Sequence, residues 1–195
     1  MSLFTIGHSN HDIQRFIELL REHRIDVVVD VRSTPYSRYV PQYSMDNLRG
    51  TLEEHNIQYL YLGKELGGHP DVPSLYDEKG YALYDRFVTT DFFQKGIARL
   101  LRVLSSGVRV VLLCSEENPN ECHRRLLITW YLYHQMHVDA IHIRGDGTIQ
   151  RESVLHADAS SSLFGDDPAL AAPPRSAKPV RNTQKQNPGE VPDEL

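Results

Sequence analysis

The sequence predicts an α/β fold: a mostly parallel sheet of about five strands with helices on both faces, in a single domain followed by a disordered C-terminal tail. Short apolar runs alternate with helical patterns up to residue 156, which is typical of consecutive βαβ units. Of the 195 residues, 40% are hydrophobic, which is enough for one core. We therefore expect one domain over residues 1–156 and a proline-rich tail over residues 157–195.

Five apolar runs are expected to form the strands. The fourth run carries a single charge, Arg109, which indicates that helices cover both faces of that strand. The expected strands span residues 3–6, 27–31, 59–62, 108–113 and 140–143.

Apolar residues at helical spacing predict the helices between these strands, and we interpret them as core. They form three stripes: Ile13, Phe16, Ile17 and Leu20; Phe92, Phe93, Ile97, Leu100, Leu101 and Leu104; and Leu126, Leu127, Trp130 and Tyr131. Residues 45–55 predict a further helix. Residues 66–79 predict a loop of a length that is typical of functional loops.

The composition changes near His156. Residues 156–195 contain six of the eleven prolines, three consecutive serines and one aromatic residue, Phe164. Such a segment buries too little apolar surface to offset its ordering entropy, so we expect disorder. The alternative is a segment that docks on the domain through Leu163 and Phe164.

The overall charge argues against a general nucleic-acid binder. The chain has 21 basic and 26 acidic residues and a formal net charge of -5, so any anion site must be local, and a nucleic-acid partner is left open. No apolar stretch of about 18 residues predicts a membrane span. Two cysteines and no signal peptide indicate a cytoplasmic location with both thiols reduced.

Polar residues follow four of the expected strands. In parallel α/β sheets ligands bind beyond the carboxyl ends of the strands, so we expect these residues to meet at one rim. They are Gly-His-Ser-Asn at 7–10, Asp-Val-Arg-Ser-Thr-Pro at 30–35 with Arg38, Leu-Gly-Gly-His-Pro at 66–70, Cys-Ser-Glu at 114–116 and Cys-His-Arg-Arg at 122–125.

With these motifs the chain resembles the domain of unknown function 488 family over about residues 1–155. The resemblance rests on five motifs in order: Thr-Ile-Gly-His-Ser at 5–9, Asp-Val-Arg at 30–32 with Pro35 and Ser37-Arg38, Leu-Gly-Gly at 66–68, Cys-Ser-Glu at 114–116 and Cys-His-Arg at 122–124. It implies a fold and a site at these positions. It implies no reaction, because the family carries no established activity.

The two cysteines stand in different settings. Cys114 closes an apolar strand, where a thiol is most often an inert small hydrophobe. Cys122 falls where a helix should begin, and the unpaired N–H groups of a helix start stabilise a thiolate. His123 and Arg124 add a base and a positive charge, while the alternative is that Cys122 only fills the core.

Known cysteine sites do not fit the spacing. A phosphatase-type loop needs Arg six residues after Cys114, where Asn120 stands. Glu116 and Glu117 would repel the phosphate of that loop and the persulfide of a rhodanese-like loop.

A structural zinc site is expected to have cysteines two to four residues apart, whereas these are eight apart, so we expect no metal. A mixed site that uses Cys114, Cys122, His8 or Asp30 stays open, and the cofactor is undetermined.

Arg32, Arg38 and Arg124 are the expected anion-binding residues, because the planar guanidinium matches carboxylate and phosphate. The alternative is a lattice of ion pairs with Asp30 and Glu116 that orders the loops.

Three hypotheses follow for function. The first is an enzyme acting on a phosphate-bearing or other anionic substrate, such as a nucleotide or a nucleic-acid end. The second is a non-catalytic module that binds a nucleotide or nucleic acid, and the third is a redox-responsive protein with a reversible disulfide.

The expected catalytic residues are Cys114, Cys122, His8, Asp30, Glu116 and His123. The expected substrate-binding residues are Arg32, Arg38, Arg124, Gly67, Gly68 and Ser9, the last of which can instead cap the first helix with Asn10.

Overall fold

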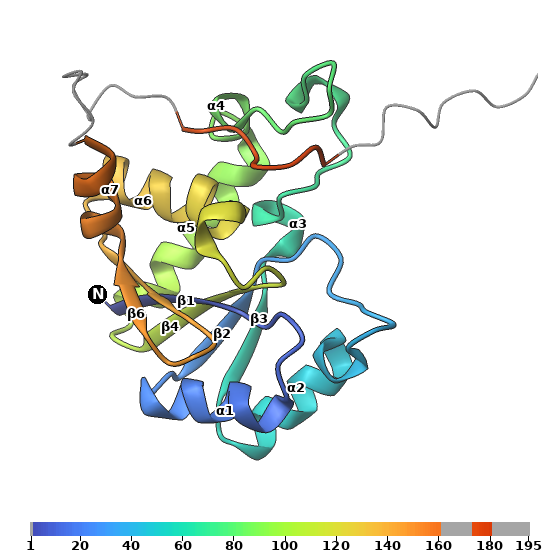
Figure 1. Ribbon diagram of the computed structural model, residues 1–195, viewed down its shortest axis with the longest axis vertical. Coiled ribbons are helices and arrows are strands. Elements are labelled where there is room, and N and C mark those ends of the chain that lie inside the picture. Colours follow the sequence, from blue (N-terminus) through green and yellow to red (C-terminus); the bar gives the residue numbers. More distant parts are fainter. Residues whose placement is uncertain (1, 161–172, 181–195) are drawn as a thin grey trace, which may run out of the picture.

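A six-stranded, mostly parallel sheet forms the centre of the molecule in the computed structural model, which describes residues 2–160 and 173–180 (Figure 1). The strands lie in the order β3-β2-β4-β1-β5-β6, and β6 alone pairs antiparallel. They are β1 (Ser2–Gly7), β2 (Val27–Asp30), β3 (Gln58–Tyr61), β4 (Arg109–Cys114), β5 (Ala140–Ile143) and β6 (Ile149–Arg151). The five expected strands are confirmed. The sixth was missed because β6 has three residues and leaves Ile149 exposed, so it forms no apolar run.

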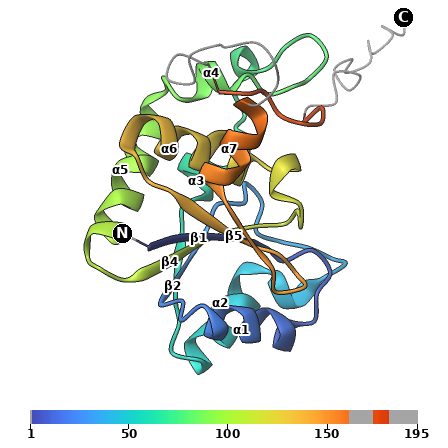
Figure 2. The same cartoon turned by 60° about the vertical axis from the view of Figure 1, so that its left-hand side comes forward.

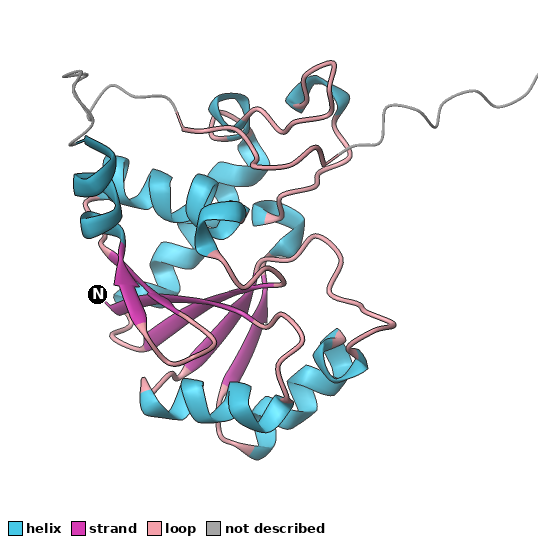
Figure 3. Ribbon diagram, viewed as in Figure 1, coloured by secondary structure: helices cyan, strands magenta, loops and turns pink. Residues whose placement is uncertain are grey.

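Helices cover both faces of the sheet, as expected (Figures 1 and 3). On one face lie α1 (Ile13–Glu22) and α2 (Met45–Glu54); on the other lie α5 (Asp91–Ser105), α6 (Trp130–Met136) and α7 (Glu152–Ser160). Figure 2 shows the same two layers from the side. Successive residues of a strand point to opposite faces, so Val111 joins the core under α1 and α2 while Val110 joins the core under α5 and α6.

Short elements connect the layers. They are α3 (Gly63–Leu66), α4 (Tyr84–Phe87), the 3-10 turns η1 (Pro41–Tyr43), η2 (Pro73–Leu75) and η3 (Pro119–Glu121), and the π-helix η4 (Arg124–Thr129). The expected loop over residues 66–79 therefore contains one turn of helix, and Leu75 anchors that turn in the core. The expected third helix begins as η4 and continues as α6.

The expected boundary at residue 157 lies inside α7. Residues 173–180, here called the C-terminal segment, contact the domain: Ser176 N–H donates to the Ala82 carbonyl at 3.1 Å, and Val180 N–H donates to the Gly80 carbonyl at 2.7 Å. Of the expected tail over residues 157–195, the structure describes residues 157–160 and 173–180. Leu163 and Phe164 lie outside the described residues.

Across residues 2–160 and 173–180, the helices lack the combination of length and apolar character that a membrane span requires.

Candidate functional site

The carboxyl ends of β1, β2 and β4 lie side by side and bring the polar motifs together. Gly7 is in register with Cys114, and Asp30 is in register with Leu113. Beyond the strands, His8 N–H donates to the Cys114 carbonyl at 3.0 Å. The sheet therefore places the motifs after the first, second and fourth expected strands at one rim.

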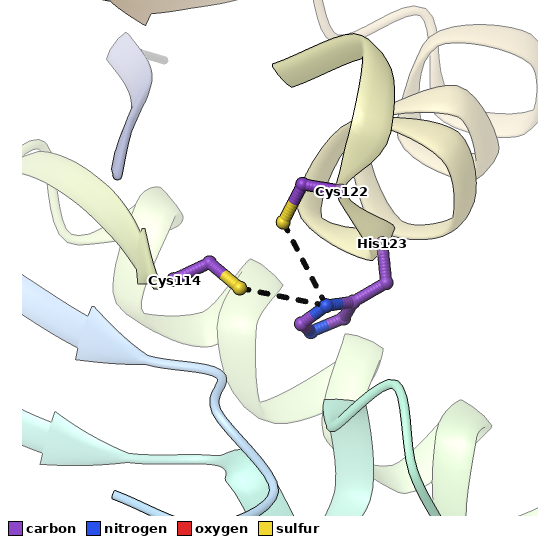
Figure 4. A group of neighbouring side chains, drawn as sticks. All are labelled: Cys114, Cys122 and His123. Carbon is purple, nitrogen blue, oxygen red and sulfur yellow. Dashed lines mark hydrogen bonds between the residues drawn. The ribbon is translucent and has the colours of Figure 1, made fainter. Parts of the chain in front are cut away.

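A cluster of two thiols and one imidazole lies at this rim (Figure 4). His123 Nδ1 is 3.6 Å from Cys114 Sγ and 3.8 Å from Cys122 Sγ. The Glu116 carboxylate also faces the sulfurs: its Oε2 accepts from Cys114 Sγ at 3.0 Å and lies 3.4 Å from Cys122 Sγ. Both cysteines are buried, with 3% and 2% exposure. The inert-packing alternative does not account for an imidazole and a carboxylate aimed at both thiols.

The start of the helical run positions Cys122. Its carbonyl accepts from the N–H groups of Arg125 and Leu126, both at 3.0 Å, which are the first hydrogen bonds of the run that leads into η4. The expected place of Cys122 at a helix start is confirmed. The partial positive charge of a helix start favours an anionic sulfur there.

The orientation of His123 follows from its second nitrogen. Nε2 donates to the Val31 carbonyl at 2.9 Å, because a carbonyl oxygen can only accept. Nδ1 is therefore the ring nitrogen that can interact with the thiols. Gly68 lies against the ring so closely that an added Cβ would be 2.8 Å from its Cγ, so a side chain at position 68 would displace His123.

The two thiols differ in acidity. Burial raises the pKa of Cys114, and its hydrogen bond with Cys122 raises it further. Burial also opposes ionisation of Cys122, but the Cys114 hydrogen bond, the charge of Arg124 and His123 outweigh it and hold the pKa of Cys122 well below its usual value. Burial lowers the pKa of His123, yet the contact with Cys122 reverses this and raises it. These directions favour a Cys122 thiolate next to a His123 imidazolium.

Arg124 is fully buried and holds the loop after β4. It donates Nη1 to the Glu116 carbonyl, Nη2 to the Glu117 carbonyl at 2.6 Å, and Nε to Thr5 Oγ1 at 3.3 Å. The alternative, an ion pair with the carboxylate of Glu116 or Asp30, is replaced by these contacts with two carbonyls and one hydroxyl. Arg124 therefore supplies positive charge beside Cys122 and fixes the path of the loop.

Arg32 does form the ion pair that the alternative hypothesis expected. Its Nε and Nη2 donate to the two carboxylate oxygens of Asp30 at 2.9 and 2.5 Å, and Tyr59 also donates to Asp30 at 2.7 Å. Its Nη1 donates to His8 Nε2 at 3.1 Å. These contacts use three of the five guanidinium N–H groups, so two can still serve a ligand.

His8 is a neutral acceptor in this arrangement. Its Nδ1 donates to the Ser9 carbonyl at 2.7 Å, and its Nε2 accepts from Arg32. Burial and then the charge of Arg32 lower the pKa of His8 to about 4. The ring stacks on Tyr43 with centroids 4.3 Å apart. His8 therefore orients Arg32 and is not protonated near neutral pH.

Two further residues predicted for the site, Arg38 and Ser9, have other surroundings. Arg38 is exposed and lines a separate hollow with Pro35 and Ser44, so it is not brought to the thiols. Ser9 N–H donates to the Ser115 carbonyl at 2.8 Å, while Asp12 caps α1, which overturns the capping alternative.

Gly67 permits close packing near the site. An added Cβ would lie 2.3 Å from the Gly63 carbonyl oxygen and 2.4 Å from Ser33 Oγ. Gly67 thus allows close contact with the backbone of α3 and with the loop after β2.

A polar pocket of about 130 Å³ opens beside Cys114. It is lined by Arg32, Ser33, Thr34, Gly68, His69, Cys114, Ser115, Glu116 and His123. A second cavity of about 220 Å³ is lined by Cys122. It shares Gly68, His69, Glu116 and His123 with the first, and Tyr84 and the C-terminal segment also line it. Ser33, Thr34, His69 and Ser115 lie within the quoted motifs and could have been chosen from them, whereas no sequence signal pointed to the C-terminal segment.

The fold and site define an α/β protein with a buried Cys-His cluster at the carboxyl ends of its parallel strands. The family model for the domain of unknown function DUF488 matches residues 12–131, which is more than half of the chain, so the chain belongs to this family. No curated protein and no solved structure matches the chain.

Proposed function

We propose that the protein is a cysteine-dependent enzyme that acts on a small anionic, phosphate-bearing substrate. The observation that carries the proposal is the position of His123 Nδ1, 3.6 and 3.8 Å from two thiols beside a polar pocket. A thiol next to an oriented imidazole is the arrangement that activates a cysteine nucleophile.

Cys122 is the nucleophile in this proposal and His123 is the group that holds and returns the proton. Three features support these roles: the helix start at Cys122, the buried charge of Arg124, and the lowered pKa of the Cys122 thiol. The Cys114 thiol stays protonated in this proposal, because burial and its contact with Cys122 raise its pKa.

Arg32 is the anion-binding residue in this proposal. It lines the pocket with Ser33 and Thr34, and two of its N–H groups are free of the contacts to Asp30 and His8. Glu116 repels a negative charge near the sulfurs. The anionic end of the substrate therefore lies at Arg32, and its reactive centre lies at the thiols.

The test compares two alkylating agents on the metal-free protein. Iodoacetate carries a carboxylate and iodoacetamide does not, so an anion site beside the thiolate should raise the ratio of their rates above the ratio for glutathione. Inorganic phosphate should slow both reactions. Peptide mass analysis assigns the label, which is expected on Cys122 before Cys114.

The control is the double variant Asp30→Asn with Arg32→Gln, which removes both buried charges together and avoids an unpaired carboxylate. It should lose the preference for iodoacetate while Cys122 still reacts with iodoacetamide. The substrate class is wrong if the wild-type ratio equals that of glutathione and phosphate gives no protection. The catalytic role is wrong if neither thiol reacts faster than glutathione, or if Cys122→Ser turns over p-nitrophenyl phosphate at the wild-type rate.

A second function is favoured by one observation: the two sulfurs and His123 Nδ1 all lie within 4.8 Å of one another. A redox-responsive protein would oxidise both thiols to a disulfide, with loss of two protons and two electrons to an oxidant such as oxidised glutathione. Non-reducing mass analysis after that treatment tests it, and Cys114→Ser should abolish the disulfide while leaving Cys122 reactive. Binding of nucleotides without turnover would instead support the non-catalytic module.

A further inference from the structure

Four electron-pair donor atoms converge at the thiol cluster. They are the Sγ atoms of Cys114 and Cys122, Nδ1 of His123 and Oε2 of Glu116. Cys114 ends β4 and Glu116 lies two residues beyond it, while Cys122 and His123 directly precede η4. Thiolate, imidazole and carboxylate are the ligand types that zinc takes in proteins.

Cys114, Cys122 and His123 form a group whose ligand atoms all lie within 4.8 Å of one another. Most of the distances from the sulfurs to Nδ1 and Oε2 are close to the edges of a zinc tetrahedron. Bonds of about 2.3 Å to sulfur and about 2.0 Å to nitrogen or oxygen separate tetrahedral ligand atoms by about 3.5–3.8 Å. The two sulfur-to-Nδ1 distances are 3.6 and 3.8 Å, and Oε2 of Glu116 lies 3.4 Å from Cys122 Sγ. A fourth distance, from Oε2 to Cys114 Sγ, is 3.0 Å and corresponds to a hydrogen bond that the metal would replace.

The surroundings of the cluster suit a metal ligand. Metal-binding histidines usually donate their other ring N–H to a backbone carbonyl or carboxylate, and His123 Nε2 donates to the Val31 carbonyl at 2.9 Å. This contact leaves Nδ1 directed at the sulfurs, so that its lone pair faces the metal position once its proton is lost. Gly68 leaves room for the ring, since an added Cβ would lie 2.8 Å from His123 Cγ.

The charges also balance. Two thiolates and one carboxylate carry three negative charges, so a bound zinc ion leaves one negative charge uncompensated. Arg124, fully buried and tied to the Glu116 and Glu117 carbonyls, supplies the matching positive charge. A buried site of this kind therefore avoids an isolated charge.

We propose that Cys114, Cys122, His123 and Glu116 bind a zinc ion. Four coordinate bonds form, and the two protons that the cluster carries, on Cys114 Sγ and on His123 Nδ1, pass to solvent. Both sulfur atoms then donate a lone pair to the metal. Zinc therefore holds the site in a state that does not react with electrophiles. This last consequence rests on the proposed function, whereas metal binding itself rests on the geometry alone.

Cobalt(II) is the probe for the metal site, because it reports its ligands by absorption. Titration of the metal-free, reduced protein should give thiolate-to-cobalt charge-transfer bands in the near ultraviolet and intense visible bands of a tetrahedral ion, both saturating at one equivalent. One equivalent of zinc should then remove these bands. Zinc should also suppress iodoacetamide labelling of both cysteines, and a chelator should restore it.

Variants separate ligands from neighbours. Cys114→Ser and Cys122→Ser should each lose charge-transfer intensity, while His69→Ala, which changes a pocket residue outside the ligand set, should keep the wild-type spectrum. Circular dichroism shows whether each variant is folded. Absence of cobalt bands in the wild type, or an unchanged spectrum in both cysteine variants, would overturn the metal site. Labelling of the metal-free protein is a separate measurement, so the proposed function can fail or hold independently.

Discussion

Gly7 ends β1 where the loop after β4 passes very close. An added Cβ would lie 1.7 Å from the Glu116 carbonyl oxygen, a backbone atom that cannot move without displacing the site. We predict that Gly7→Ala lowers the free energy of unfolding by about 3 kcal/mol, because overpacking forces backbone shifts. Urea unfolding measures the loss.

Gly50 is the matched control for this substitution. It lies in α2, and an added Cβ would have nothing within 4 Å. Gly50→Ala should raise stability by up to about 1 kcal/mol, the helix propensity difference between the two residues. Equal effects of the two substitutions would contradict the close approach at Gly7.

Glu152 is a fully buried carboxylate at the start of α7. His142 Nε2 lies 2.7 Å from its Oε2, and Arg125 Nε lies 3.1 Å from its Oε1. Burial opposes its ionisation, but the hydrogen bonds from His142 and His156 and the charge of Arg125 outweigh it and hold the pKa of Glu152 far below its usual value. The ionised form therefore stabilises the folded state.

The sign of the pH effect follows from the lowered pKa. The contribution of Glu152 is fully present above the unfolded pKa of about 4.3 and is lost as pH falls from there through the folded pKa. We predict that Glu152→Gln costs about 3 kcal/mol at pH 7. The stability of the variant should also fall less steeply than that of the wild type below about pH 4. Urea unfolding over a pH series tests both, and parallel curves would contradict the prediction.

At the scale of elements, the C-terminal segment forms one wall of the cavity of Cys122. Ser176 is buried, and its Oγ accepts from Ala82 N–H at 2.9 Å. We predict that Ser176→Ala lowers stability by about 1 kcal/mol, the usual net value of one hydrogen bond. It should also speed the alkylation of Cys122, because the segment that lines its cavity is released more often.

Lys178 provides the control within the same segment. Its Nζ lies 2.6 Å from Glu121 Oε2 in an exposed ion pair, which solvent screens. Lys178→Ala should leave both the melting temperature and the rate of Cys122 alkylation unchanged. A larger effect at Lys178 than at Ser176 would mean that charge, not the buried hydrogen bond, holds the segment.

The π-helix η4 is the element that sequence periodicity described least well. A stripe at helical spacing singled out Leu126, Leu127 and Trp130, yet the structure also buries Ile128 and Thr129. A π turn holds more residues than an α turn, so its inward face follows a wider period. The same turn brings Arg124 under the loop after β4.

At the scale of the whole molecule, the sheet and both helix layers lie within residues 2–160. We predict that a chain ending at Ser160 keeps its far-ultraviolet circular dichroism and unfolds cooperatively, since the core clusters centre on these residues. Alkylation of Cys122 should be faster than in the full chain, because residues 173–180 no longer line its cavity. Loss of a cooperative transition would show that the C-terminal residues are required for folding.

The sequence by itself determined the sheet and its two layers. Alternating apolar runs and helical stripes specify strands and helices locally. The rule that ligands bind at the carboxyl ends of parallel strands predicts His8, Arg32 and Cys114 at one rim. The sequence did not predict the short β6 or the contacts of the C-terminal segment, because neither segment has a periodic apolar pattern.

Only the tertiary structure decided what the rim contains. The two cysteines are eight residues apart, which does not match the spacing of known zinc motifs. Those spacing rules assume that the ligands lie on one local turn. The path of the loop between Cys114 and Cys122 is set by distant residues: Gly7 lets it approach β1, and Arg124 holds its carbonyls. These contacts between segments far apart in sequence bring two thiols, an imidazole and a carboxylate to one point.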